Sequence, residues 1–129
     1  MCLKNYRWIF LFMLIPSGLN AQFLEKLNTI PADSLEQRYQ VYLDGVIHYF
    51  TKSPHFDSAL YYIDAGLEAF EGHSEYSIPF LRNKGVYYDI AGVDDSALKY
   101  LRSSLNESLA RNLDELSAKS NTELGNYYY

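Results

Sequence analysis

The sequence predicts an all-α fold built from repeated antiparallel helical hairpins. Two stretches, Asp57–Leu67 and Asp95–Leu105, align without gaps at an offset of 38 and match at Asp, Ser, Ala, Leu, Tyr and the final Leu. Three glycines, Gly45, Gly85 and Gly125, recur with a period of 40 in stretches with helical patterning, and aromatic residues follow each of them. Self-similarity at a fixed period indicates a repeat architecture. Because no stretch alternates apolar and polar residues convincingly, strands are not expected.

Helix starts and stops divide the chain into five expected helices after a linker. Ser34 and Gln37 have the spacing of a capping box, and Pro79 is expected in the first turn of the third helix, where a missing N–H does no harm. The second helix is expected to close at Gly72. The expected ranges are 34–50, 56–71, 77 to about 91, 94 through the apolar stripe that reaches Leu109, and 114 to the end of the sequence.

Glycine inside a helix costs about 1 kcal/mol relative to alanine, so its repetition calls for a structural reason. We interpret Gly45 and Gly85 as points where the partner helix of each hairpin approaches closely, with Ala59 and Ala97 as the small residues that face them.

The first 21 residues have the features of a secretory signal peptide. Lys4 and Arg7 precede the unbroken apolar run 8–15, and Ala21 supplies a small residue for cleavage. The apolar run has eight residues, too short for a membrane span of roughly 20, so no stable span is expected. Cleavage would remove Cys2 and leave nine basic and 16 acidic residues, a net charge of −7, which disfavours nucleic acid as a partner. The expected domains are a signal peptide (1–21), a linker (22–33) and helical repeats (34–72, 77–113 and an incomplete 114–129).

These residues resemble the tetratricopeptide repeat (TPR) family, in the long-period form found in exported bacterial proteins. Small and large positions of that family are matched by Leu81, Gly85 and Tyr88 in the third helix and by Ala97 and Leu101 in the fourth. The usual unit is about 34 residues, so periods of 38 and 40 imply longer helices or joints. The resemblance covers roughly residues 34–129 and implies a short α-solenoid of about two and a half repeats.

The resemblance also implies a groove for a protein or peptide partner, lined by the first helix of each unit. On that basis an aromatic and partly charged groove is predicted, with the alternative that these side chains pack against residues 23–30 or a neighbouring chain. The predicted groove residues are Tyr39, Tyr42, Val46, Tyr49, Arg82, Val86 and Asp89.

Catalytic and cofactor chemistry find no support in the sequence. His48, His55 and His73 fall on different elements without the i, i+4 pairing of a helical metal site, so no metal is predicted. Paired acids such as Asp94-Asp95 stand at helix starts, where they favour the positive end of the dipole. No nucleophile motif or phosphate-binding glycine loop is present, so the protein is predicted not to be an enzyme and to need no cofactor.

The function predicted from the sequence is a non-catalytic, exported bacterial scaffold, periplasmic or extracellular, that binds a protein or peptide. The alternative is the sensor portion of a signalling protein, a histidine kinase or transcription regulator, that continues beyond Tyr129. The third unit stops within its first helix, which suggests a fragment of a longer protein, or self-association through the uncovered C-terminal helix.

Overall fold

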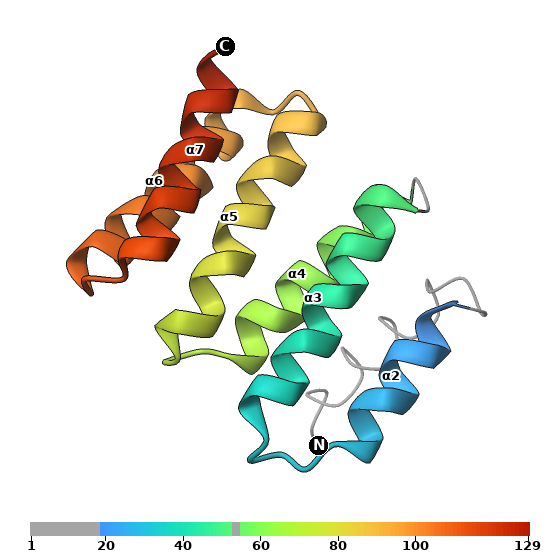
Figure 1. Ribbon diagram of the computed structural model, residues 1–129. Coiled ribbons are helices and arrows are strands. Elements are labelled where there is room, and N and C mark those ends of the chain that lie inside the picture. Colours follow the sequence, from blue (N-terminus) through green and yellow to red (C-terminus); the bar gives the residue numbers. More distant parts are fainter. Residues whose placement is uncertain (1–18, 53–54) are drawn as a thin grey trace, which may run out of the picture. The chain divides into compact units, whose positions relative to one another are not determined.

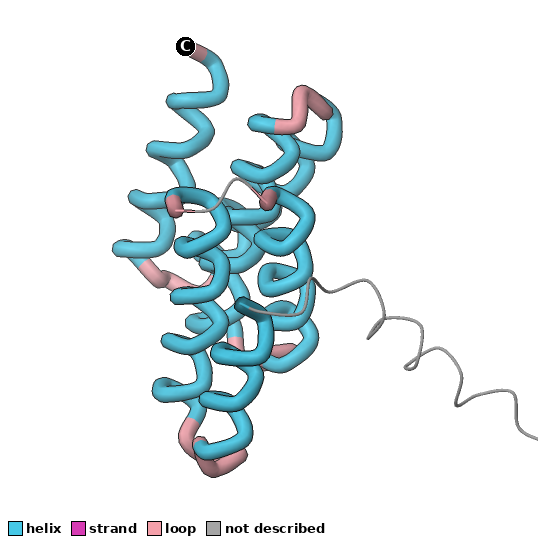
Figure 2. The backbone as a smooth tube through the Cα atoms, turned by 90° about the vertical axis from the view of Figure 1, so that its right-hand side faces the viewer, coloured by secondary structure: helices cyan, strands magenta, loops and turns pink. Residues whose placement is uncertain are grey.

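The computed structural model describes residues 19–52 and 55–129, and over these residues the chain is helical, without strands (Figure 1). Figure 2 shows these helices joined by short loops. The all-α prediction is therefore confirmed for the described part of the chain. The helices are α2 (Leu19–Thr29), α3 (Leu35–Thr51), α4 (Phe56–Ala69), α5 (Ser74–Ile90), α6 (Asp94–Ala110) and α7 (Asp114–Tyr128).

The chain forms two compact units, residues 1–41 and 42–129, with the boundary inside α3. In the first unit, the Arg38 guanidinium donates to the carbonyls of Leu27 and Ile30, at 3.2 and 3.1 Å, and so satisfies backbone acceptors at the end of α2. The stretch 22–33 was expected to be a linker, but the larger part of it belongs to the helix α2. The expected signal peptide lies largely outside the described residues, and the expected cleavage point after Ala21 falls within α2.

Three joints in the second unit share one backbone design. Gly72, Gly92 and Asn112 follow α4, α5 and α6 and have left-handed φ angles of 82°, 71° and 56°. Glycine adopts this conformation without steric cost, and asparagine is among the residues that tolerate it best. After Gly92 and Asn112, the amides of the next residues donate at 2.9 Å to carbonyls five residues back, which closes each helix in the manner of a Schellman motif. Such short joints make consecutive helices antiparallel neighbours.

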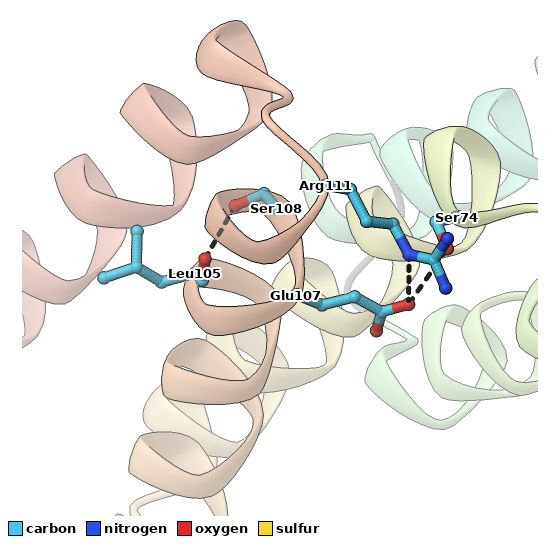
Figure 3. A network of polar contacts seen from close by, with 5 residues as sticks. All are labelled: Ser74, Leu105, Glu107, Ser108 and Arg111. Atoms are coloured by element: carbon cyan, nitrogen blue, oxygen red, sulfur yellow. Dashed lines mark hydrogen bonds and ion pairs between the residues drawn. The ribbon is translucent and has the colours of Figure 1, made fainter.

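Contacts within the second unit follow this antiparallel order. At one end of α5, Ser74 donates to the Glu107 carboxylate near the end of α6, at 3.1 Å, and Arg111 lies 3.8 Å from the same oxygen (Figure 3). At the other end of the pair, the rings of Tyr88 and Tyr100 stack with centroids 5.6 Å apart.

Gly45 and Gly85 do lie where helices approach closely, as predicted. A Cβ on Gly45 would stand 2.7 Å from the Tyr62 ring, and a Cβ on Gly85 would stand 2.6 Å from the Leu101 side chain. The side chains nearest to the two glycines are therefore Tyr62 and Leu101, while Ala59 and Ala97, which the sequence pattern placed there, are fully buried on the same partner helices. A large side chain seated in the space left by glycine buries more apolar surface than two small residues facing each other.

The start of α5 differs from the expectation. The helix begins at Ser74, three residues before the expected Ser77, so Pro79 lies within the helix and not in its first turn. The amides of Tyr76 and Ser77 both bond to the carbonyl of His73 at 3.0 Å, which starts the helix on backbone contacts alone. Pro79 and its neighbour Phe80 are both buried, and the Phe80 ring lies against Gly66 of α4.

Candidate functional site

The structure separates the predicted groove residues into buried and accessible ones. Val46 and Tyr49 have exposed fractions of 0% and 2%, so both side chains belong to the interior. Tyr49 stacks on Tyr62 of α4, with ring centroids 5.7 Å apart. Neither residue presents a surface to a partner in this conformation. The sequence could not reveal this because the same aromatic helix face suits packing and binding equally well.

Tyr42 and Tyr39 are half-buried and lie in different units. The Tyr42 ring packs edge-on against Phe70 and Phe80, at centroid distances of 5.9 and 6.4 Å, and so connects α3 with α4 and α5. Tyr39 belongs to the first compact unit. Tyr42 is thus part of an aromatic cluster whose packing supports α5.

The remaining predicted residues share one face of α5. Arg82, Val86 and Asp89 follow one another at spacings of four and three, which place them on adjoining turns of the same face. Arg82 and Val86 are half-buried and Asp89 is exposed. Among the described residues no acceptor bonds to Nη1 of Arg82, although this nitrogen is buried. A buried N–H without an acceptor carries a free-energy cost of about 1–3 kcal/mol, more when the group is charged.

The charged side chain of Lys84, on α5, has partners on both neighbouring helices. Its Nζ lies 2.7 Å from the Asp64 carboxylate on α4 and 4.9 Å from the centre of the Tyr100 ring on α6. Burial lowers the pKa of Lys84, but the hydrogen bond and charge of Asp64 outweigh it, and the net pKa is raised. Lys84 therefore stays charged and links three helices.

Three tyrosines of this unit, Tyr61, Tyr62 and Tyr87, have pKa values that burial shifts upward. Burial raises the pKa of Tyr61 and of Tyr62, and neighbouring phenols raise both further. Burial and then the Asp57 carboxylate, 3.5 Å away, raise the pKa of Tyr87. These shifts oppose ionisation, so the three phenols are neutral packing and hydrogen-bonding groups near neutral pH.

The three histidines lie on different elements: His48 in α3, His55 before α4 and His73 before α5. His55 and His73 are exposed residues that precede α4 and α5, and the His48 ring packs edge-on against Tyr49 at 5.1 Å. Within the described residues, no group of three or more His, Cys, Asp or Glu side chains is arranged to hold a metal ion. No helix in the described ranges is both long enough and apolar enough to cross a membrane.

Comparisons with protein-family models, curated proteins and solved structures found no match to the chain. The candidate site therefore rests on the geometry of α5 and its neighbours.

Proposed function

We propose that this protein is a TPR-like helical scaffold, exported and non-catalytic, that binds a protein or peptide along the face of α5 formed by Arg82, Val86 and Asp89. Two glycine-centred hairpins, α3 with α4 and α5 with α6, support a stacked repeat arrangement. The left-handed residues Gly72, Gly92 and Asn112 stand at equal intervals along the chain, which supports a regular repeat of helix and joint.

The observation that carries the proposal is the buried, unbonded Nη1 of Arg82. A guanidinium is a planar donor suited to two parallel bonds with a carboxylate, and it also bonds to backbone carbonyls. Because this nitrogen is buried while Arg82 as a whole is half-buried, a partner's acceptor reaches it once the side chain turns outward, and binding then removes the cost of the unbonded donor.

The neighbours of Arg82 define the chemistry of the partner further. Val86 offers an apolar contact one turn along the face, and Asp89 offers an exposed carboxylate one turn beyond that. A segment with an acceptor, an apolar side chain and a donor in that order matches the face. An extended peptide and a helix can both present such an order.

A selection experiment with a matched control tests the proposal. A display library of random peptides is selected on the full chain, and the selected peptides are then titrated against Arg82→Met and Arg111→Met. Arg111 is an exposed arginine that follows α6 and whose ion pair with Glu107 is long, at 3.8 Å, so it controls for the loss of one positive charge. Arg82→Met is expected to weaken binding at least about tenfold, since charge-assisted hydrogen bonds contribute roughly 1.5–3 kcal/mol. Arg111→Met is expected to leave binding nearly unchanged.

A stability measurement separates a binding role from a structural one. Because Arg82→Met removes a buried donor without an acceptor, its free energy of unfolding is expected to equal or exceed that of the wild type. Selected peptides that bind Arg82→Met as tightly as the wild type would contradict the proposal. So would a large loss of stability in this variant, since it would show that Arg82 holds the fold together.

A further inference from the structure

The bond between Ala21 and Gln22, at which the expected signal peptide would be removed, lies near the start of α2. A small residue directly before the cleaved bond is typical of such sites. Cleavage there leaves residues 22–29 of the helix, about two turns, and makes Gln22 the first residue of the mature chain. The signal sequence and the helix therefore meet at a glutamine.

The part of α2 that remains after cleavage keeps the contacts that hold it. Leu27 is buried, with an exposed fraction of 6%, and Phe23 and Leu24 are half-buried. The Arg38 guanidinium of α3 donates to two carbonyls at the end of the helix, at 3.2 and 3.1 Å. Because all these residues belong to the mature chain, we expect the helix to persist with Gln22, which is exposed, at its N-terminal end.

A glutamine with a free α-amino group can react with itself. The α-amino nitrogen attacks the Cδ carbonyl carbon of the side chain, and a bond forms between them. The bond from Cδ to Nε2 breaks, and Nε2 leaves as ammonia with one proton taken from the attacking amine. The product is pyroglutamate, a lactam. The reaction consumes no oxidant, metal ion or second substrate.

The electrostatics of the helix start favour this reaction. An α-ammonium group at the first residue of a helix lies at the positive end of the helix dipole, which disfavours the charged form. The neutral amine is the form that attacks, and the lactam that it forms carries no charge. Glu25 is the acidic residue of the first turn after cleavage, and it is exposed, so water weakens its attraction for the ammonium group.

We propose that the exported chain carries pyroglutamate at position 22, formed from Gln22 after residues 1–21 are removed. This modification rests on the export that is part of the proposed function, and it does not depend on the α5 binding face. Aminopeptidases bind a free N-terminal amine, which the lactam lacks. The modification therefore protects α2, the first helix of the mature chain, from digestion at its exposed end.

Mass spectrometry of the exported protein tests this inference. The full chain is produced in a bacterial host, collected from outside the cytoplasm and digested with trypsin, which cleaves after Lys26 and releases residues 22–26. The carboxamide of this peptide is that of Gln22, so a mass lower by one ammonia molecule identifies the lactam. Most of the wild-type peptide is expected to show this loss. An isotope-labelled copy of the unmodified peptide, added when the cells are broken, is expected to keep its mass through the work-up.

Gln22→Asn is the matched control variant. It keeps a carboxamide but shortens the side chain by one methylene group, so the corresponding lactam would be a smaller and strained ring. The variant is expected to be cleaved at the same bond and to keep its free amine. A wild-type peptide that begins at Gln22 with a free amine would overturn the inference and leave export standing, as would cleavage at another bond. Equal loss of ammonia from the labelled peptide would also overturn it. A protein that still contains residues 1–21 would overturn both the modification and the proposed export.

Discussion

Two helix interfaces at equivalent places in the sequence repeat are built from different side chains, aromatic in one and serine in the other. Where α4 meets α5, Gly66 receives the Phe80 ring, and Phe70 and Phe80 stack with centroids 6.1 Å apart. Where α6 meets α7, the equivalent positions of the repeat are all serines: Ser104, Ser108 and Ser120 stand in place of Gly66, Phe70 and Phe80. All three serines are fully buried.

The same backbone arrangement thus allows two kinds of packing, one by aromatic rings and one by small polar side chains. Each aromatic ring removes roughly 150–250 Å² from water, so the α4–α5 interface is held chiefly by apolar burial. A buried serine contributes little apolar area and needs a partner for its hydroxyl. Ser104 and Ser108 donate to carbonyls three residues earlier, at 2.8 Å, as Figure 3 shows for Ser108 and Leu105. We therefore expect the free energy of unfolding to depend far more on the aromatic interface than on the serine one.

The largest expected effect comes from truncating the aromatic interface. Phe80→Ala removes a fully buried ring that also fills the space above Gly66, and it should lower the free energy of unfolding by about 3–5 kcal/mol, measured by urea denaturation. Ser120→Ala, at the equivalent position of α7, is the matched control and should cause no loss. If the two variants lost similar amounts of unfolding free energy, the two interfaces would not differ in their contribution to stability.

The next largest effect on stability is expected from replacing glycines with alanine. Gly85 lies on a covered helix face and Gly125 on an open one, so the two variants can be compared. In Gly85→Ala the new Cβ would stand 2.6 Å from Leu101 Cγ and 3.0 Å from the Leu101 backbone nitrogen. The helices must separate to admit it, at a cost of about 1–3 kcal/mol. Gly125→Ala meets no such obstacle and should stabilise the monomer by roughly 0.5–1 kcal/mol through helix propensity. Thermal unfolding at low protein concentration measures both, and a destabilised Gly125→Ala would show that this face is covered in solution.

The repeat and its hairpins were predictable because their signals are local and periodic. The two sequence periods, 38 and 40, located the hairpins and their glycines, and Gly72 and Asp94 marked helix boundaries that the structure places within a few residues. The helix α2 was missed because its stretch is short, and because the carbonyls at its end are satisfied by Arg38, which lies beyond the following joint, in α3.

The candidate site was predicted less well because one helix face can serve packing or binding. Periodicity placed Val46 and Tyr49 on a common face, but only the position of Tyr62 decides that Tyr49 is covered. The unbonded nitrogen of Arg82 has no sequence signature, since it follows from which acceptors the fold brings near. The pairing of Lys84 on α5 with Asp64 on α4 is likewise a property of the assembled helices.

The aromatic side of the repeat carries a pH dependence that buried serines cannot have. Burial raises the pKa of Tyr62 above its ordinary value of 10.0, so near neutral pH its phenol is protonated in both the folded and unfolded states. Its contribution to stability is fully present below pH 10 and is lost as the pH rises toward the folded pKa, because the unfolded chain then releases the proton first. The loss should not exceed about 1.4 kcal/mol per pH unit. Urea denaturation between about pH 8 and 11 should show a shallower decline in Tyr62→Phe, and equal slopes would contradict this assignment.

The smallest expected effects lie within the serine interface and have opposite signs. The Ser117 hydroxyl lies 3.1 Å from Ser108 Oγ and 3.0 Å from the Leu113 carbonyl, so Ser117→Ala should lower the free energy of unfolding by about 1 kcal/mol. The Ser120 hydroxyl is buried and has no hydrogen-bond partner in the described part of the chain, so Ser120→Ala should raise it by a similar amount. Both changes remove one hydroxyl from the same helix, and helix propensity favours alanine equally in each. A difference in sign therefore isolates hydrogen bonding as the property that holds α6 and α7 together, whereas matching signs would mean that side-chain volume alone decides.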